Sequence, residues 1–125
     1  IYKNKGVGIF NKTEKKINYD VNLENVTEVD INELLQKALN EKNNELAIRF
    51  YFLKLLKILA NKNYIKWHAD KTNIQYYYEI KNPELKKDFE YASYLYTYIW
   101  FGKHEISEDL FLNAQNHFKT ILSRY

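Results

Sequence analysis

The segment of residues 43–61, NNELAIRFYFLKLLKILAN, constrains the fold more than any other part of the sequence. Wound as a helix, it places four polar side chains within one sector of roughly 140°, and the rest of its circumference is almost wholly apolar. These four are Arg49, Lys54, Lys57 and Asn61. A helix with so much apolar surface needs neighbours on most sides, so we expect it to be the central helix of a bundle.

The composition agrees with a helical fold. The chain has 125 residues, 46% of them apolar, which is enough for one domain with a buried core. It contains one Pro and three Gly, so few tight turns are encoded and long helices are favoured over an all-β fold. It contains no Cys, which excludes a disulfide scaffold and any thiolate metal site.

A helix before the central one is predicted by a capping box at residue 30. Asp30 is a favourable N-cap, and Glu33 follows three residues later, as the box requires. Val29 and Leu34 occupy the positions of a hydrophobic staple on either side of the cap. We expect this helix to continue to about Lys42.

The stretch DKTNIQYYYEI, residues 70–80, can be interpreted as a ligand site or as the start of a helix. Thr72 followed three residues later by Gln75 forms a second capping box, so the polar tetrad has a sufficient structural explanation. We therefore predict a helix of about residues 73–80. Its three consecutive tyrosines point about 100° apart, so at least one of them should lie near water.

Two longer helices complete the chain. Asn82 is a capping residue with Pro83 at the favoured first position, and this helix should end at Gly102. Ser107 caps the last helix. The expected core faces of the two helices are Leu85, Phe89, Ala92, Leu95, Tyr96 and Ile99 in the first, and Phe111, Ala114, Phe118 and Ile121 in the second.

The remaining segments lack a helical period. Residues 63–69 can form a short strand that pairs with residues 103–106 in a two-stranded ribbon, and residues 17–23 alternate apolar with polar side chains, which is typical of an extended segment. We predict an all-α fold, a small bundle of about five helices with an extended N-terminal arm and one short ribbon. Its expected parts are a basic extended juxtamembrane arm, residues 1–29, and a helical domain, residues 30–125.

The basic character of the chain is concentrated at its start. Residues 1–16 carry five lysines and one glutamate, whereas the remaining residues carry 14 basic and 15 acidic side chains. A basic leader is typical of a cytoplasmic segment beside a membrane, and the alternative is a solvated tail without a partner. The near-neutral remainder argues against a nucleic-acid partner. The predicted membrane-surface contacts are Lys3, Lys5, Lys12, Lys15 and Lys16.

No arrangement of residues reaches the standard of an active site. His68 and His104 lie on the two segments of the predicted ribbon, with Asp70 and Glu105 nearby, so a weak divalent-metal site there is one hypothesis and a pair of ordinary loop histidines is the other. The sequence has no phosphate-binding loop and no nucleophile motif. We predict no catalytic residue, no bound metal and no cofactor.

A group of aromatic residues lies outside the expected core face of the helix that begins at Pro83. This face also carries Lys87, Glu90 and Thr97, which a core face would not carry together. Tyrosine is favoured at protein contacts, so we predict an interaction surface covered by the arm, by a second copy or by a partner, and ordinary half-buried tyrosines are the alternative. The residues of this surface are Tyr91, Tyr94, Tyr98 and Phe101.

A family resemblance covers about residues 33–122. It rests on three segments in a fixed order, LAIRFYFLKLLKILANKNYIKW, DKTNIQYYYEI and FEYASYLYTYIWFGKHEISEDLF. Together they resemble a bacterial domain of unknown function, number 4129 in that series. Gln75 stands where the family pattern has Glu, and it still closes a capping box. The matching positions are Ala47, Ile48, Arg49, Tyr51, Leu53, Leu56, Ile65, Trp67, Thr72, Asn73, Tyr76, Phe89, Gly102 and Ser107.

The resemblance implies a location but no activity. In that family the domain usually follows a transmembrane helix at the C-terminus of a longer protein, and some members carry a transglutaminase-like domain on the far side of the membrane. This implies a module on the cytoplasmic face of a bacterial inner membrane, tethered by a helix upstream of Ile1. The absence of Met also leads us to expect that the chain is a piece of something longer.

The sequence therefore predicts a non-enzymatic, cytoplasmic, C-terminal helical domain that acts as a protein-interaction module and binds a protein partner or itself. The alternative is a nucleic-acid-binding module, since helices combined with a ribbon can resemble a winged helix. A third hypothesis is an enzyme with a weak metal site at His68 and His104.

Overall fold

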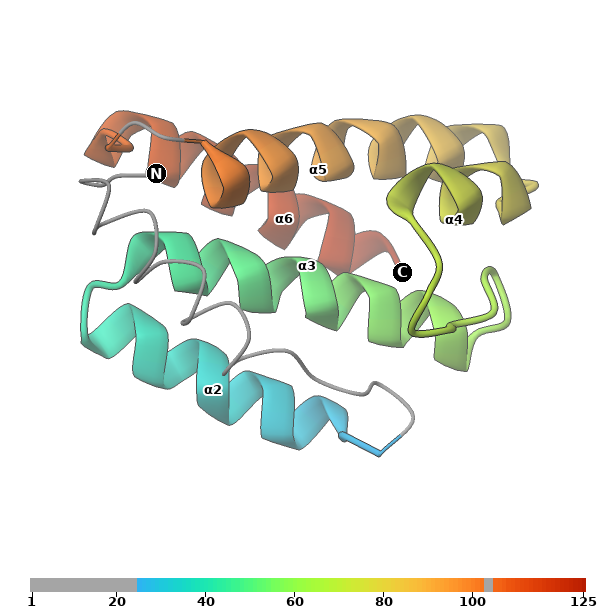
Figure 1. Cartoon of the computed structure of the whole chain (residues 1–125), viewed down its shortest axis with the longest axis horizontal. Helices are drawn as coiled ribbons and strands as arrows, with labels where there is room; N and C mark the ends of the chain where they lie inside the picture. Colours follow the sequence, from blue (N-terminus) through green and yellow to red (C-terminus); the bar gives the residue numbers. More distant parts are fainter. Residues whose placement is uncertain (1–24, 103–104) are drawn as a thin grey trace.

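A computed structural model describes residues 25–102 and 105–125 of the chain. Within these residues the fold is all-helical, as predicted, and five helices form a small bundle (Figure 1). The predicted arm lies almost wholly outside the described residues, as do the five leader lysines. The helices are α2 (Glu28–Asn40), α3 (Asn44–Asn61), α4 (Asn73–Glu79), α5 (Pro83–Phe101) and α6 (Glu108–Arg124).

The apolar helix α3 is central, which confirms the prediction. It packs against α2, α5 and α6. In Figure 1, α2 runs along one side of α3 and α5 along the other, with α6 behind. Ten of its 18 residues are buried, and only a helix enclosed on several sides can reach that fraction.

The predicted core faces of α5 and α6 are also confirmed, because every residue assigned to them is buried. Phe52 of α3 joins the three helices: its ring contacts Phe89 and Tyr96 of α5 and Phe118 of α6. The core is thus rich in aromatic rings that come from different helices. Such rings contribute large buried areas and specific ring-to-ring geometry.

Four of the five helix starts agree with the sequence. At each, the side-chain oxygen of the capping residue accepts a hydrogen bond from the backbone amide three residues later. At α4 the predicted capping box is complete, since the side chain of Gln75 also accepts from the amide of Thr72, at 2.7 Å. The capping residues are Asn43, Thr72, Asn82 and Ser107.

The predicted cap of the first helix is wrong. Helix α2 begins at Glu28, and its N-cap is Thr27, whose hydroxyl accepts from the amide of Asp30 at 3.0 Å. The Asp30 carboxylate accepts in return from the amide of Thr27 at 3.1 Å, so Asp30 is the closing residue of the box rather than its cap. The staple is absent as well, because Val29 is 63% exposed.

The predicted ribbon is not formed by the segment that should have supplied its first strand. Residues 63–69 contain no strand, while residues 103–104 of the other segment are not described. The backbone groups that a strand would pair are bonded to side chains instead. The hydroxyl of Tyr76 accepts from the amide of His68 and donates to its carbonyl, and the carboxylate of Glu79 accepts from the amide of Lys66. A strand ladder cannot form on groups that are already bonded.

Candidate functional site

Three tyrosines of α5 form a stacked row on the surface, which we call the tyrosine ladder: Tyr91, Tyr94 and Tyr98. They are 43%, 59% and 44% exposed. The ring centroids of Tyr91 and Tyr94 lie 6.2 Å apart, and those of Tyr94 and Tyr98 lie 6.1 Å apart, with interplanar angles of 21° and 20°. Spacings of three and four residues place the three side chains on one face of the helix, so each ring supports the next.

His117 of α6 packs under one end of the ladder. Its ring centroid lies 4.5 Å from that of Tyr91, with the two planes at 90°. Burial lowers the pKa of His117 below its ordinary value of 6.5, although a hydrogen bond with the backbone of Asp88 and the charge of that carboxylate act in the opposite direction. The imidazole is therefore neutral near pH 7, and it makes an edge-to-face contact with the ring of Tyr91.

The same end of the bundle is closed by a polar contact between α5 and α6. The carboxylate of Asp88 accepts a hydrogen bond from the guanidinium of Arg124 at 2.9 Å and one from the hydroxyl of Tyr125 at 3.3 Å. Asp88 is largely covered while Arg124 is about half exposed, so this ion pair is only partly screened by solvent. It fixes the position of α6, and with it the position of His117 beneath the ladder.

Phe101, the fourth predicted surface residue, lies in a different environment from the ladder. It is 55% exposed, and its ring makes an edge contact with the buried ring of Tyr96, at a centroid distance of 5.9 Å. It also lines a pocket of about 410 Å³ between α3, α5 and the loop before α4. The predicted group of four therefore divides into a ladder of three and one residue at a pocket edge.

Arg49 also lines that pocket, together with Lys71, and the sequence analysis placed Arg49 only in the polar sector of α3. Its guanidinium carbon lies 5.6 Å from the ring centroid of Tyr96 and 5.8 Å from that of Trp100, so it is held by cation–π contacts. It also donates a hydrogen bond to the hydroxyl of Tyr96. No local signal reveals this arrangement, because the two aromatic residues lie about 50 positions later in the chain.

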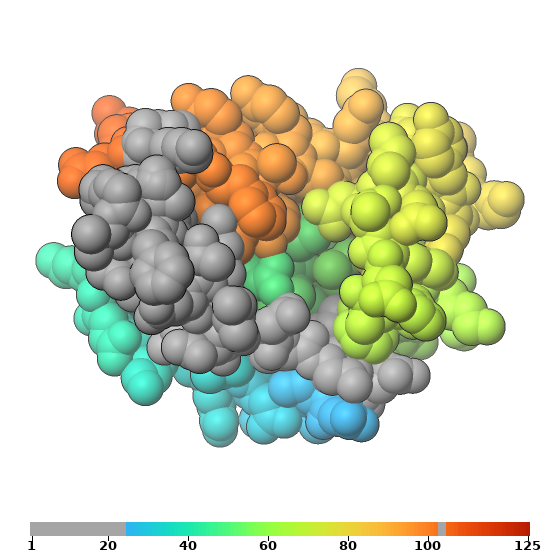
Figure 2. Space-filling view, viewed as in Figure 1, coloured from blue at the N-terminus to red at the C-terminus, as the bar shows by residue number. Residues whose placement is uncertain are grey.

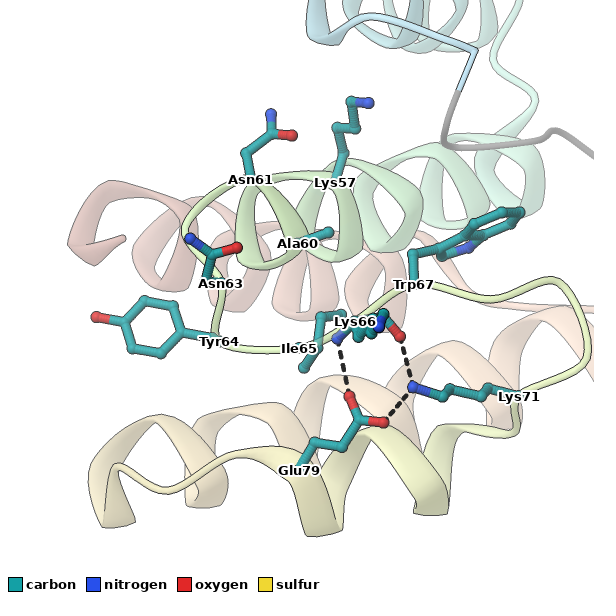
Figure 3. A pocket seen from close by; sticks show the side chains of 10 residues that line it. All are labelled: Lys57, Ala60, Asn61, Asn63, Tyr64, Ile65, Lys66, Trp67, Lys71 and Glu79. Carbon is teal, nitrogen blue, oxygen red and sulfur yellow. Dashed lines mark hydrogen bonds and ion pairs between the residues drawn. The ribbon is translucent and has the colours of Figure 1, made fainter.

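A second pocket, of about 830 Å³, lies where the loop after α3 meets α4 (Figure 3). Glu79 of α4 points toward this loop and binds it at two points, through the amide of Lys66 at 2.8 Å and through the ammonium of Lys71. Lys71 also donates to the carbonyl of Lys66 at 2.7 Å. Burial would raise the pKa of Glu79, but the hydrogen bonds from Lys71 and Lys66 outweigh it and lower that pKa below its ordinary value. The cluster thus fastens the loop to α4.

The three consecutive tyrosines of α4 separate as the helical geometry predicted. Tyr76 is buried and holds the loop at His68, Tyr77 is half-buried, and Tyr78 is 67% exposed. The ammonium of Lys86 lies 4.8 Å from the ring centroid of Tyr77 and 5.4 Å from that of Tyr78, which covers part of both rings. The capping box of Thr72 and Gln75 and the three tyrosines of this stretch therefore all have structural partners.

The metal hypothesis receives no support from the described residues, in which no group of three or more potential ligands gathers. The imidazole Nδ1 of His68 lies 4.0 Å from a carboxylate oxygen of Asp70, and both side chains are mostly exposed. His104 lies outside the described residues, so its position relative to His68 stays a prediction. The same holds for the membrane contacts of the leader lysines, Lys3 to Lys16.

In comparisons with known proteins, no family model, no curated protein and no solved structure matches the chain. Among the residues described here, none of the helices is long and apolar enough to cross a membrane.

Proposed function

We propose that this domain is a protein-interaction module and that the tyrosine ladder of α5 is its contact surface. The observation that carries the proposal is the exposure of three stacked tyrosines, at 43–59%, on a helix whose opposite face is completely buried. Each phenol combines an apolar ring with a hydroxyl that can bond to a partner. Side chains of this kind are enriched at protein interfaces and at their hot spots.

The ladder is already ordered before a partner arrives. Stacking of each ring on the next, with His117 beneath Tyr91, limits the rotamers that the three side chains can adopt. A contact made with such rings loses less side-chain entropy than one made with flexible side chains. Covering the apolar part of the rings would also contribute about 25 cal/mol per Å² removed from water.

The ring spacing favours a protein over a nucleic acid at this surface. A base that enters between two rings needs about 6.8 Å between them, which is twice the stacking distance of about 3.4 Å. The ring centroids lie 6.1 and 6.2 Å apart, so the spaces between the rings are too narrow for a base. A surface that cannot take a base between its rings is better suited to the side chains and backbone of a protein partner.

The test compares two charge-introducing variants at equally exposed sites. Tyr94 on the ladder and Ile74 on α4 are each 59% exposed, so replacing either by Glu removes a similarly exposed apolar side chain. Tyr94→Glu should abolish binding of the partner, or of a second copy in sedimentation experiments, and leave the melting temperature nearly unchanged. Ile74→Glu should leave both unchanged.

Two outcomes would contradict this proposal. In the first, the Tyr94→Glu protein keeps both its stability and its contacts, and the ladder is then a solvent-exposed surface with no role in binding. The wild-type chain could instead bind duplex DNA, with an affinity that falls steeply with salt, and lose that affinity in Tyr94→Glu. That result would favour the nucleic-acid alternative.

We also propose that the module works at the cytoplasmic face of a bacterial membrane, held by a segment upstream of Ile1. The support is the excess of lysine in residues 1–16 and the family resemblance. The chain should bind vesicles that contain anionic lipid, weakly and less at higher salt, with about 1 kcal/mol from each Lys near the surface. Removal of residues 1–16 should abolish this binding and leave the helical domain folded. Equal binding by the shortened chain would rule out the leader as the membrane contact.

A further inference from the structure

Helix α2 is attached to the bundle through a single neighbour. Among the described helices it contacts α3 and no other. It lies on the side of α3 opposite α5 in Figure 1, and its blue and cyan atoms follow the lower edge of the view in Figure 2. Helix α2 can therefore leave α3 without breaking a contact between any other pair of described helices.

The apolar face of α2 needs a cover wherever the helix goes. Ile31, Leu35 and Ala38 are 0%, 7% and 1% exposed. Moving these side chains into water would lose the stabilisation that burial of apolar area provides. A detached α2 therefore needs a surface of the same shape and chemistry, and the α3 of a second copy offers an identical one.

The turn between α2 and α3 is short and holds one residue in an unfavourable conformation. Residues 41–43 connect the two helices, and the φ of Lys42 is 56°. The amide of Lys42 donates to the carbonyl of Leu39 at 3.1 Å and that of Asn43 to the carbonyl of Ala38 at 2.9 Å, which is a Schellman motif. Glycine is the usual residue at this left-handed position, because the Cβ of other residues is crowded there. The closed turn is therefore strained at Lys42.

The turn after α3 has the same geometry but a residue that tolerates it. The φ of Asn63 is 65°, its amide donates to the carbonyl of Ala60, and the amide of Tyr64 donates to that of Leu59. Asparagine is enriched in the left-handed region, because its short polar side chain can form local hydrogen bonds. Lysine has no such compensation. Of these two turns, opening would therefore relieve more strain at the one between α2 and α3.

The sequence across this turn suits a continuous helix. Residues 28–61 contain neither Gly nor Pro. Glu41 and Lys42 have high helix propensity, and Asn43 is only moderately unfavourable. A short, strained connection between two such segments favours the exchange of one of them between copies.

We propose that two copies of this chain form a dimer by exchanging α2, with Lys42 as the hinge. In each copy residues 28–61 become one helix, and α2 packs on the α3 of the second copy. The dimer keeps the α2–α3 contacts of the monomer and removes the left-handed residue from both hinges. The inference does not depend on the tyrosine ladder, because the ladder belongs to α5.

Refolding from urea at two protein concentrations tests the proposal. The connection holds α2 beside its own α3 at an effective concentration in the millimolar range, so chain refolded at about 10 µM should be monomeric and chain refolded at about 1 mM should contain dimer. Size-exclusion chromatography separates the two forms. In a dimer refolded from isotope-labelled and unlabelled chains, isotope-filtered NMR should detect Leu35 of one copy in contact with α3 of the other.

Two substitutions of Lys42 remove the same charge and should differ in their effect on the dimer. Lys42→Gly relaxes the closed turn in both copies and weakens a continuous helix, so the association constant should fall at least about tenfold. Lys42→Ala keeps the Cβ and raises the helix propensity, so the association constant should be equal to that of the wild type or a few-fold higher. Asn63→Gly, at the other left-handed turn, is the control and should leave the association constant unchanged.

Each of the following results would overturn the proposal. The wild type and Lys42→Ala both stay monomeric after refolding at about 1 mM. Lys42→Gly and Lys42→Ala form equal amounts of dimer, or the dimer shows no contact between copies at Leu35. A dimer that is lost in Tyr94→Glu and kept in Lys42→Gly is a contact between two ladders rather than an exchange of α2.

Discussion

The aromatic residues of α5 form two groups that differ in how their rings are held. Inside the bundle, Tyr96 stacks on Phe52 of α3 with centroids 4.5 Å apart and planes within 3°. On the surface, the ladder rings lie 6.1 to 6.2 Å apart at about 20°, and all three come from one helix. The two groups differ mainly in burial and in the number of helices that supply the rings, because the centroid of Phe52 also lies 5.9 Å from that of Phe89 and 6.5 Å from that of Phe118. The buried group therefore determines the fold, and the exposed group can be changed without altering it.

The largest expected loss of stability follows a substitution in the buried group of rings. Phe52 is 1% exposed and contacts rings from two other helices, so Phe52→Ala should lower the free energy of unfolding by roughly 3–5 kcal/mol. Urea unfolding followed by circular dichroism measures it. Leu112→Ala is the control, since Leu112 is 44% exposed and should change by less than about 0.5 kcal/mol. Similar losses in the two variants would show that the buried rings are not the core of this fold.

The sequence predicted the parts of the fold that depend on local patterns. The apolar circumference of residues 44–61, the caps at Asn82 and Ser107 and the inward faces of α5 and α6 all follow from spacing along one segment. The cap of α2 was wrong because two boxes overlap: Thr27 with Asp30 and Asp30 with Glu33 both fit the pattern. The earlier box gives a longer helix and satisfies more backbone amides.

Features that depend on distant residues were not predictable in this way. The segment after α3 was predicted to be a strand because it lacks a helical period, yet Tyr76 and Glu79 take its backbone hydrogen bonds. Arg49 looks like a solvent-facing residue, yet Tyr96 and Trp100 cover it. The ladder itself was visible in the sequence as a group of aromatics off the core face. Its stacking, and the imidazole of His117 beneath it, were not.

The next largest effect is expected at the capping boxes, which belong to neither aromatic group. Thr72→Ala removes the hydroxyl that accepts from the amide of Gln75, and should lower stability by about 1 kcal/mol. Thr27→Ala should cost a similar amount, because α2 has a box of the same kind. Thr97→Ala, in the exposed interior of α5, is the control. Partner binding should be unchanged in the two cap variants, and a Thr72→Ala protein that loses binding with an unchanged urea midpoint would make residues 72–75 a ligand site after all.

The buried imidazole of His117, which contacts Tyr91 of the ladder, should make the stability of the fold depend on pH. Its pKa is lowered in the folded state by burial, so the unfolded chain binds more protons as the pH falls below the ordinary value of 6.5. Stability should be fully present above about pH 6.5, decrease as the pH falls below it, and level off once the folded protein is also protonated.

Urea unfolding of the wild type and of His117→Gln, at about pH 7.5 and about pH 5.5, measures this contribution. The difference between the two proteins should be larger at the higher pH, and the nearby charges of Asp88 and Arg124 are common to both. His68, which is mostly exposed, supplies the control variant His68→Gln. A wild type and a His117→Gln protein with parallel pH profiles would contradict a buried neutral imidazole beneath Tyr91.

The smallest effect on stability should come from the ladder itself. Tyr94 is the middle residue of the ladder. It is 59% exposed and makes ring contacts with Tyr91 and Tyr98 of its own helix. Tyr94→Ala replaces it with the residue of highest helix propensity, which offsets part of the lost stacking. The net change should therefore stay within about 0.5 kcal/mol, in contrast to the loss at Phe52. If the N-terminal arm covered the ladder, Tyr94→Ala would instead lower the melting temperature. One variant thus separates the two cases, because a ladder that is open to a partner tolerates this change and a ladder that is covered by the arm does not.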